Sequence, residues 1–269
     1  MAITAPAAAV AAATAYEQLH VPALFRQFAP LLADAAGIGA GQRVLDVACG
    51  TGVVAREAAA RVGDDGRVYG LDAAAGMLAV AAQLAPGVDW REGDACALPY
   101  ADASFDAVTS QFGLMFFPDR ARAAAEMLRV LVPGGRFAVA VWDALERSAG
   151  YPDLVDLLER RAGRAAADAL RAPFVLGDRD ALAALFRDAG ASTVDVVTHH
   201  GTARFPSVRA LVEADLRGWL PVMGVELDDD LVESLLAAAE PLLQPYVTPA
   251  GTVEFDAPAH LVSGRRATP

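Results

Sequence analysis

Short apolar runs alternate with helix-like segments along the first half of the chain. Each run is five to seven residues long, which is the length of a buried strand. The runs cover residues 43–47, 67–72, 88–94, 105–111 and 136–142. Between them, segments such as 53–62 and 120–132 carry small or apolar residues at helical spacing. Strands that alternate with helices predict an α/β fold with a doubly wound, mostly parallel sheet, whose ligands bind at the carboxyl ends of the strands.

The rest of the chain has a more helical pattern. Residues 16–36 and 178–189 place apolar side chains at helical intervals. Residues 206–246 are also predicted to be helical, with Ser207 and Asp228 as N-caps, because a side-chain oxygen there can accept a bond from a free N–H of the first turn.

Two further strands are predicted near the C-terminus, at residues 193–198 and 259–265. Pro258 is expected to prevent the second of them from beginning earlier, because proline has no N–H to donate to a strand ladder. The alanine-rich stretch 1–15 lacks the positive start of a signal peptide and is expected to be a frayed tail.

Composition and charge narrow the class of function. The 269 residues, 55% of them hydrophobic, suit one large α/β domain with insertions or two small domains. The net charge is −12 and no basic run occurs, which disfavours binding to nucleic acid or anionic lipid. No run approaches the roughly 18 apolar residues that span a membrane. The two cysteines and four histidines show neither a disulfide framework nor metal-ligand spacing, so we expect no metal and a reducing, cytoplasmic setting.

A glycine turn joins the first strand to the next helix across residues 46–52. Such a turn leaves backbone N–H groups free at the helix start, where an anionic or electron-rich ligand can bind. Gly50 and Gly52 fit a dinucleotide fingerprint, and Asp72 lies at about the right distance for a ribose-binding carboxylate. Asp46 favours a different ligand, because a carboxylate at this strand end can meet the cationic amino group of a methionine moiety.

The pattern Asp46-x-Ala48-x-Gly50-x-Gly52 resembles the first motif of class I S-adenosylmethionine-dependent methyltransferases, with alanine in place of the first glycine. Five motifs of that family occur in its order within about residues 37–142. They are 44–52, 69–78, 93–99, 104–108 and 128–135. The chain therefore resembles the type 11 or ubiquinone/menaquinone methyltransferase-like group. The resemblance implies a Rossmann-like methyltransferase fold with an antiparallel last strand, and a helical insertion would here separate the two strands of its terminal hairpin.

The resemblance also implies S-adenosyl-L-methionine as the cofactor. Asp72 would accept hydrogen bonds from the ribose hydroxyls, and Met77 would pack on the adenine. Asp72 could instead only cap the next helix, and Met77 could be ordinary core. The cofactor-binding residues implied in this way are Tyr16, Asp46, Ala48, Cys49, Gly50, Gly52, Asp72, Ala73, Met77, Gly93, Asp94, Ala95 and Gln111.

The segment 111–117 follows the fourth strand, where the family places its acceptor pocket. Its aromatic and sulfur side chains predict an apolar or aromatic small molecule as the methyl acceptor, although Phe116 could equally pack against the next helix. The expected acceptor-binding residues are Phe112, Met115, Phe116, Trp142 and Trp219. Methyl transfer needs mainly alignment and exclusion of water, and we assign no catalytic base from the sequence.

One methyltransferase domain is predicted over residues 1–269. Its core would comprise residues 37–147, 174–204 and 252–266. The remaining helical segments, 1–36, 148–173 and 205–251, are expected to form a lid over the ligand, because exclusion of water requires a cover.

The expected partner is a small-molecule acceptor, and a homodimer is left open. Two other functions remain open on the same scaffold. One is an enzyme that uses S-adenosylmethionine without methylating, and the other is a regulatory protein that binds the cofactor without turnover. A dinucleotide-dependent oxidoreductase is disfavoured by Asp46 and Asp94.

Overall fold

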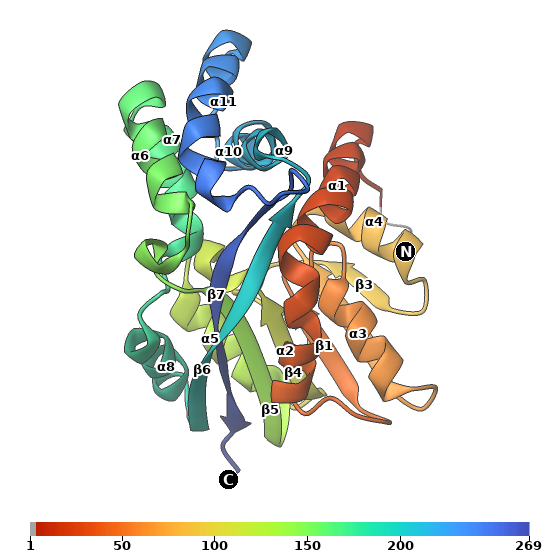
Figure 1. The fold of residues 1–269 in the computed structure, drawn as a ribbon. Helices are drawn as coiled ribbons and strands as arrows, with labels where there is room; N and C mark the ends of the chain where they lie inside the picture. Colours follow the sequence, from red (N-terminus) through yellow and green to blue (C-terminus); the bar gives the residue numbers. More distant parts are fainter. Residues whose placement is uncertain (1–3, 269) are drawn as a thin grey trace.

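A seven-stranded sheet runs through the computed structural model, which describes residues 4–268, and helices flank the sheet and gather at one end of it (Figure 1). The strand order is β3-β2-β1-β4-β5-β7-β6. The strands are β1 (Arg43–Val47), β2 (Arg67–Asp72), β3 (Asp89–Glu92), β4 (Phe105–Gln111), β5 (Leu131–Trp142), β6 (Ala191–Phe205) and β7 (Val253–Arg266). All pairs from β3 to β5 are parallel, and β7 is antiparallel to both of its neighbours. The predicted fold class is confirmed.

The central strands are buried on both faces. In β1, Val44, Leu45 and Val47 have no exposed surface, and residues 137–141 of β5 are equally buried. Continuous apolar runs of this kind suit a parallel sheet that is covered by helices on both sides. Because β1, β2 and β4 run in parallel, the turns that follow them meet at one edge, and that edge carries the candidate site.

The terminal hairpin is longer than the sequence predicts. β6 and β7 pair over their full lengths, from Ala191 with Arg266 to Phe205 with Val253. The expectation that Pro258 delays the last strand is wrong. β7 begins at Val253, five residues before Pro258 and six before the predicted start at residue 259. Pro258 lies just beyond the last β5 pair, Trp142 with Ala259, and its carbonyl accepts from the N–H of Asp143 (3.0 Å). Pro258 thus lies where the pairing of β5 with β7 ends, and proline is tolerated there because the ladder with β5 does not continue beyond it.

The N-terminal segment is a helix and not the frayed tail that composition suggests. Helix α1 spans Ala7–His20, and residues 1–3 of the predicted tail and lid lie outside the described residues. Alanine-rich helices of this length are marginal alone. Here α1 packs against α4 (Ala75–Leu84): a Cβ on Gly76 would lie only 2.6 Å from the carbonyl oxygen of Ala9. This close crossing, together with the burial of Ala13 on α1, fixes a helix whose own pattern of apolar residues is weak.

Further helices complete the layers around the sheet and the group at its end. Those around the sheet are α2 (Ala29–Ala35), α3 (Val53–Val62), α5 (Arg120–Val130) and α8 (Arg179–Asp188). Those gathered at the end are α6 (Tyr151–Ala162), α7 (Arg164–Arg171), α9 (Val208–Glu213), α10 (Leu220–Val222) and α11 (Asp229–Leu243). The predicted N-caps are confirmed, since the side chain of Ser207 accepts from Ala210 N and that of Asp228 from Leu231 N. Within residues 4–268, none of the helices has the length and apolar character needed to cross a membrane.

Two turns of π-helix interrupt these elements. The first, η1 (Val21–Phe25), continues α1, and the second, η6 (Ala214–Trp219), continues α9. Such turns are uncommon and occur frequently at functional sites. The η6 turn carries Asp215, whose carboxyl lies in a hollow of about 240 Å³ among α6, α7, α9 and α11. The other lining residues are Leu154, Leu157, Leu158, Leu170, Val212, Leu216 and Leu235.

Asp215 makes stability depend on pH. Its Oδ2 atom is buried without a hydrogen-bond partner among the described residues, and burial raises the pKa of this carboxyl to about 7. In the unfolded chain the same group ionises near 3.8, so stability falls as pH rises from about 4 to about 7 and stays low above that. Asp215→Asn should therefore stabilise the protein at pH 8 by up to roughly 4 kcal/mol relative to its effect at pH 4.

Urea denaturation at several pH values measures this difference. Asp46 is also buried with a raised pKa and makes the free energy of unfolding depend on pH in the same way in both proteins. The contribution of Asp215 is therefore the difference in this pH dependence between the variant and the wild type. Glu226→Gln, at an exposed position of the same region, is the matched control and should leave the slope unchanged. An Asp215→Asn protein with the wild-type pH slope would contradict the assignment.

Candidate active site

The turn after β1 is held in a conformation that most residues avoid. Ala48, Gly50 and Gly52 all have positive φ, at 54°, 55° and 85°. For alanine this costs about 1–3 kcal/mol, and such strain concentrates at functional sites. The turn after β4 shows the same feature at Phe112 (φ 54°). The two turns touch, because a Cβ on Gly113 would lie 2.6 Å from the Cβ of Ala48, so Gly113 makes room for the methyl group that replaces the family's glycine.

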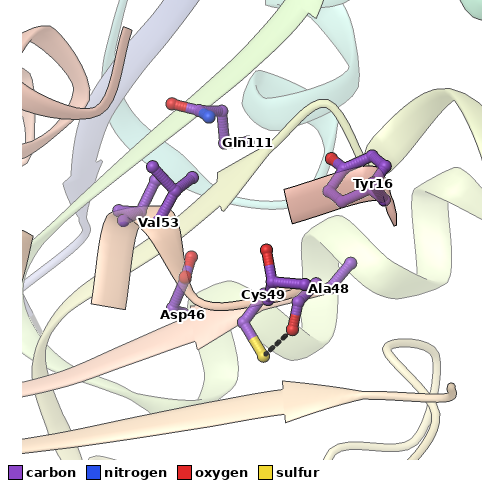
Figure 2. Close-up of a pocket in the computed structure, with 9 residues that line it drawn as sticks. Tyr16, Asp46, Ala48, Cys49, Val53 and Gln111 are labelled. Carbon is purple, nitrogen blue, oxygen red and sulfur yellow. Dashed lines mark hydrogen bonds between the residues drawn. The ribbon is translucent and has the colours of Figure 1, made fainter. Parts of the chain in front are cut away.

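A hollow with about 300 Å³ of empty space, part of it open to solvent, lies over this turn. Its lining residues are Tyr16, Asp46, Ala48, Cys49, Gly50, Thr51, Val53, Val54 and Gln111. Figure 2 shows Gln111 and Tyr16 on the opposite side of the hollow from Ala48 and Cys49. Sequence reasoning missed Thr51, Val53 and Val54, which follow the glycines directly and could have been found from that position.

Asp46 lies beneath the hollow and joins two elements. One carboxylate oxygen accepts from the Thr109 hydroxyl of β4 (2.9 Å), and the other accepts from the Ala55 N–H of α3 (3.1 Å). Burial raises the pKa of Asp46 to about 7, and these two hydrogen bonds oppose the shift. The carboxyl is therefore fixed in place and able to gain or lose a charge near neutral pH, according to what binds beside it.

Asp72 holds the glycine turn from the neighbouring strand. Its carboxylate accepts from the N–H of Gly50 (2.8 Å) and from that of Ala74 (2.8 Å). Burial raises its pKa, and the backbone N–H bonds oppose that effect. A carboxylate can accept about four hydrogen bonds, so the bonds to this turn do not use its full capacity. Asp72 does not cap helix α4, whose N-cap residue is Ala74 and receives no side-chain capping bond, and the ribose role of Asp72 stays a prediction.

Gln111 supplies an unused acceptor at the edge of the hollow. Its amide nitrogen donates to the Phe25 carbonyl (3.2 Å), which fixes the side chain, and its Oε1 is buried without a partner among residues 4–268. A buried acceptor left unpaired costs about 1–3 kcal/mol. The hollow is thus lined by a carboxylic residue, Asp46, and by Gln111 with its unpaired amide oxygen, and both groups could accept from a cationic ammonium group.

Helix α1 covers the glycine turn through Tyr16 and Glu17. The Glu17 carboxylate accepts from the Thr51 hydroxyl (2.5 Å) and from the Arg56 guanidinium (2.8 Å), and Arg56 also donates to the Thr51 carbonyl (2.7 Å). Tyr16 lines the hollow, and burial, reinforced by Asp72 and Glu17, raises the pKa of its hydroxyl well above the usual value. Tyr16 is therefore a neutral phenol at physiological pH. Sequence reasoning missed Glu17.

The structure places the other predicted cofactor residues outside this hollow. Gly52 has a packing role, since a Cβ there would lie 2.4 Å from the Trp90 indole, a residue that the sequence did not single out. Asp94 is exposed and accepts from Cys96 N (2.8 Å) within its own turn. The remaining ones are Ala73, which is exposed, Met77 and Gly93, which are half-buried, and Ala95, which is buried.

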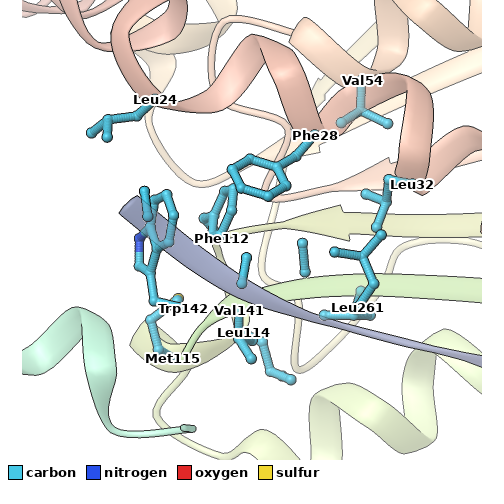
Figure 3. Packing of buried hydrophobic residues seen from close by; sticks show 14 of the residues in the cluster. Leu24, Phe28, Leu32, Val54, Phe112, Leu114, Met115, Val141, Trp142 and Leu261 are labelled. Atoms are coloured by element: carbon cyan, nitrogen blue, oxygen red, sulfur yellow. The ribbon is translucent and has the colours of Figure 1, made fainter. Parts of the chain in front are cut away.

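The predicted acceptor residues separate into two groups. Phe112 and Trp142 stack on one another with ring centroids 4.0 Å apart, are each 8% exposed, and pack against Phe28 (Figure 3). Met115 is also buried. Phe116 is 39% exposed and contacts Trp219 of η6, with centroids 4.9 Å apart. Only this second pair offers aromatic surface, and it joins the turn after β4 to the helices at the end of the sheet.

The comparisons with known proteins agree with this geometry. Residues 45–139 match the family described as a methyltransferase domain. Over 115 residues the chain is 50% identical to the demethylmenaquinone methyltransferase of Renibacterium salmoninarum, a match that covers 43% of this chain and 47% of that protein. Over 102 residues it is 47% identical to the 2-phytyl-1,4-naphthoquinone methyltransferase of Thermosynechococcus vestitus, covering 37% of this chain and 45% of that protein. The chain thus matches less than half the length of each of these two curated relatives.

A solved structure extends the likeness of fold. Phosphoethanolamine N-methyltransferase 2 of Haemonchus contortus, in complex with S-adenosyl-L-methionine, superposes with a TM-score of 0.60 at 18% identity, covering 95% of this chain and 57% of that one. At this identity the likeness concerns the fold alone. The family match shows a methyltransferase domain at residues 45–139, and the solved structure shows that the chain as a whole shares a methyltransferase fold. S-adenosylmethionine is the cofactor of such a domain, and the bare backbone, Asp46 and the orphaned Gln111 oxygen fit it.

The Glu17 contacts generate a prediction about α1. Glu17→Ala removes charge-assisted hydrogen bonds that are partly exposed and should lower the local opening free energy of α1 by about 1–2 kcal/mol. Amide hydrogen exchange across residues 7–20 should then become about 5- to 30-fold faster, while exchange in β4 stays unchanged. Gln18→Ala, at an exposed position of the same helix, is the matched control. Equal protection of α1 in both variants would show that the apolar contacts with α4 alone hold this helix.

Proposed function

We propose that this protein transfers a methyl group from S-adenosylmethionine to an apolar, quinone-like small molecule. The observation that carries the proposal is the buried, unpartnered Oε1 atom of Gln111, a residue that lines the hollow of bare backbone together with Asp46. The two curated relatives, named for naphthoquinone-type substrates, support the acceptor class. The aromatic pair of the exposed Phe116 and the half-buried Trp219 suits a flat apolar ring.

The chain's own residues would divide the work between binding and alignment. Asp46 and Gln111 would hold the ammonium group, and the glycine turn would lie against the rest of the cofactor. Asp72, with Ala73, Met77, Gly93, Asp94 and Ala95 along the same edge of the sheet, would contact the ribose and adenine. The bound cofactor supplies an already activated methyl group. The protein must then align the acceptor with it and exclude water, and alignment can contribute up to about 7–11 kcal/mol.

The helices at the end of the sheet would act as the lid. Three features support this role: α1 is tied to the glycine turn through Glu17, Trp219 of η6 contacts Phe116, and the Trp219 indole N–H donates to the Ala169 carbonyl of α7 (2.8 Å). Phe112 and Trp142 would form the rigid floor beneath the acceptor. Movement of η6 and α7 away from Phe116 would open the site.

We further propose a cytoplasmic location. Cys49 and Cys96 are both free thiols, and burial, with Asp72 and Asp46 nearby, raises the pKa of Cys49 well above its usual value. An inert thiol at the cofactor turn suits a compartment in which cysteines stay reduced.

Calorimetry and turnover test the proposed function. S-adenosylhomocysteine should bind with measurable heat, and NAD should give no comparable heat. With S-adenosylmethionine present, S-adenosylhomocysteine should be released with hydroxylated naphthalenes or naphthoquinols, and more slowly with aliphatic amines. Preferential NAD binding would contradict the proposal. Cofactor binding without release for any acceptor would favour a regulatory protein.

A variant of Gln111 refines the binding test. Gln111→Leu removes the orphaned acceptor and should weaken S-adenosylhomocysteine by about 1–3 kcal/mol, or roughly 5- to 150-fold. Gln18→Ala, on exposed surface, should bind as the wild type does. Unchanged affinity in Gln111→Leu would mean that the cofactor's ammonium group lies elsewhere.

Trp219 tests the lid. Trp219→Ala removes the aromatic surface that faces Phe116 and should impair acceptor turnover, while cofactor affinity changes by less than threefold, or about 0.7 kcal/mol. Hydrogen exchange in residues 205–251 should slow only when cofactor and acceptor are both bound. Normal turnover in the variant, with exchange that ignores both ligands, would identify this segment as a structural support.

A further inference from the structure

His20 lies where the two π-helical turns meet. It is the last residue of α1, directly before η1, and its Cε1 atom lies 3.9 Å from the position that a Cβ on Gly218 of η6 would take. Its ring stacks on that of Tyr16, with centroids 5.4 Å apart and planes at 20°. Tyr16 lines the cofactor hollow, and Trp219, the residue after Gly218, contacts Phe116. His20 therefore lies between the cofactor site and the proposed acceptor wall.

The Nδ1 atom of His20 is buried and has no hydrogen-bond partner within residues 4–268. The other histidines with described hydrogen bonds differ from it: His260 uses both ring nitrogens, on Thr198 and on the Gly177 carbonyl, and the exposed His200 pairs with Asp256. Leaving a buried ring nitrogen unpaired costs about 1–3 kcal/mol. An unpaired nitrogen at the junction of two unusual turns therefore points to a ligand group that completes it.

The other ionisable groups near His20 are committed elsewhere or cannot accept a proton. The Glu17 carboxylate is bonded to Thr51 and Arg56, and Arg217 of η6 pairs with Asp229. Tyr16 remains a neutral phenol, as described above. The fourth group on these turns, Asp215, lies in the leucine-lined hollow on the α6 side of η6.

We propose that His20 is the general base of the methyl transfer, and that its Nδ1 accepts the proton of an aromatic hydroxyl on the acceptor. The O–H bond breaks, its electron pair stays on the oxygen, and an N–H bond forms on the imidazole. The resulting aryloxide oxygen attacks the methyl carbon, the bond from that carbon to the donor's sulfur breaks with its electron pair left on the sulfur, and the imidazolium releases its proton to water. If the neighbouring ring carbon attacks instead, that carbon then loses its hydrogen as a proton to water and the oxygen takes a proton back from the imidazolium. The proposal rests on the proposed function and narrows the acceptor to hydroxylated aromatic rings.

Electrostatics suit this role. Burial lowers the pKa of His20, and no charged neighbour opposes that shift. The imidazole is therefore neutral at physiological pH and able to take a proton. A base of this kind loses activity only as the pH falls through its lowered pKa.

Two variants separate proton acceptance from simple contact. His20→Asn keeps a polar group that can accept a hydrogen bond but does not take a proton, and His20→Phe keeps only a ring to stack on Tyr16. With 2-naphthol as acceptor, His20→Asn should lower kcat/KM by about 100-fold or more. Its activity should lose the acid limb of the wild-type pH profile and rise with the acceptor's own ionisation. His200→Asn, the same change at an exposed histidine, is the matched control and should behave as wild type.

Binding without turnover gives an independent readout. Wild type and His20→Asn should both prefer 2-naphthol to naphthalene by about fivefold, the effect of one net hydrogen bond, and His20→Phe should lose that preference. All variants should bind S-adenosylhomocysteine within threefold of wild type, which verifies the fold. Turnover in His20→Asn within threefold of wild type, with the acid limb intact, would overturn the assignment of His20. A wild type that binds no S-adenosylhomocysteine or methylates no acceptor would instead overturn the proposed function.

Discussion

The tethering of the glycine turn is the constraint on which the site depends. Three residues of this turn, Ala48, Gly50 and Gly52, have left-handed backbone conformations, which glycine adopts freely but which Ala48 keeps only because the surroundings fix it. The neighbouring strand β2 supplies that fixation: its end accepts from two successive N–H groups, Cys49 N onto the Leu71 carbonyl (3.1 Å) and Gly50 N onto Asp72 (2.8 Å). The turn is thus preorganised by main chain and carboxylate from an adjacent strand, and a ligand can lie against it without first ordering it.

Negative charge gathers around this turn. Asp46 and Asp72 come from two strand ends and Glu17 from the helix above, and their mutual influence contributes to the raised pKa values of Asp46, Tyr16 and Cys49. Such a site repels a pyrophosphate and attracts a cation. A bound ammonium group would favour the ionised form of Asp46 and lower its pKa. The electrostatics therefore give a physical reason why a sequence with a dinucleotide-like glycine pattern suits the cationic cofactor S-adenosylmethionine.

An aromatic cluster makes the floor of the site rigid. Phe25 and Phe28, from the segment after α1, pack against the stacked rings of Phe112 and Trp142. Figure 3 shows Phe28 beside Phe112 and Trp142. This packing couples the N-terminal helices to the ends of β4 and β5, and it explains the positive φ of Phe112, whose ring must turn back into the core. The helices proposed as the lid lie above this floor, where α1 contacts η6.

The local pattern of the sequence determined the sheet and the place of the site. β1, β2 and β4 begin and end at the predicted residues, and the hollow gathers Tyr16, Asp46, Ala48, Cys49, Gly50 and Gln111 as expected. These features follow from short apolar runs, glycines and strand ends, whose preferences are set by neighbours in the chain. Parallel strands then bring their ends to one edge whatever the details of packing.

Tertiary packing alone decided the rest. Helix α1 forms because Gly76 admits the backbone of Ala9, and β7 passes Pro258 because β5 has already ended beside it. Phe112 and Trp142 are part of the core because Phe25 and Phe28, far away in the sequence, pack against them. Gly52 leaves room for the Trp90 indole, which a side chain at this position would contact. The unpaired nitrogen of His20 depends on which helix lies opposite it. Contacts between distant segments leave no periodic trace in the sequence, so only the folded chain determines which side chains face a ligand and which face each other.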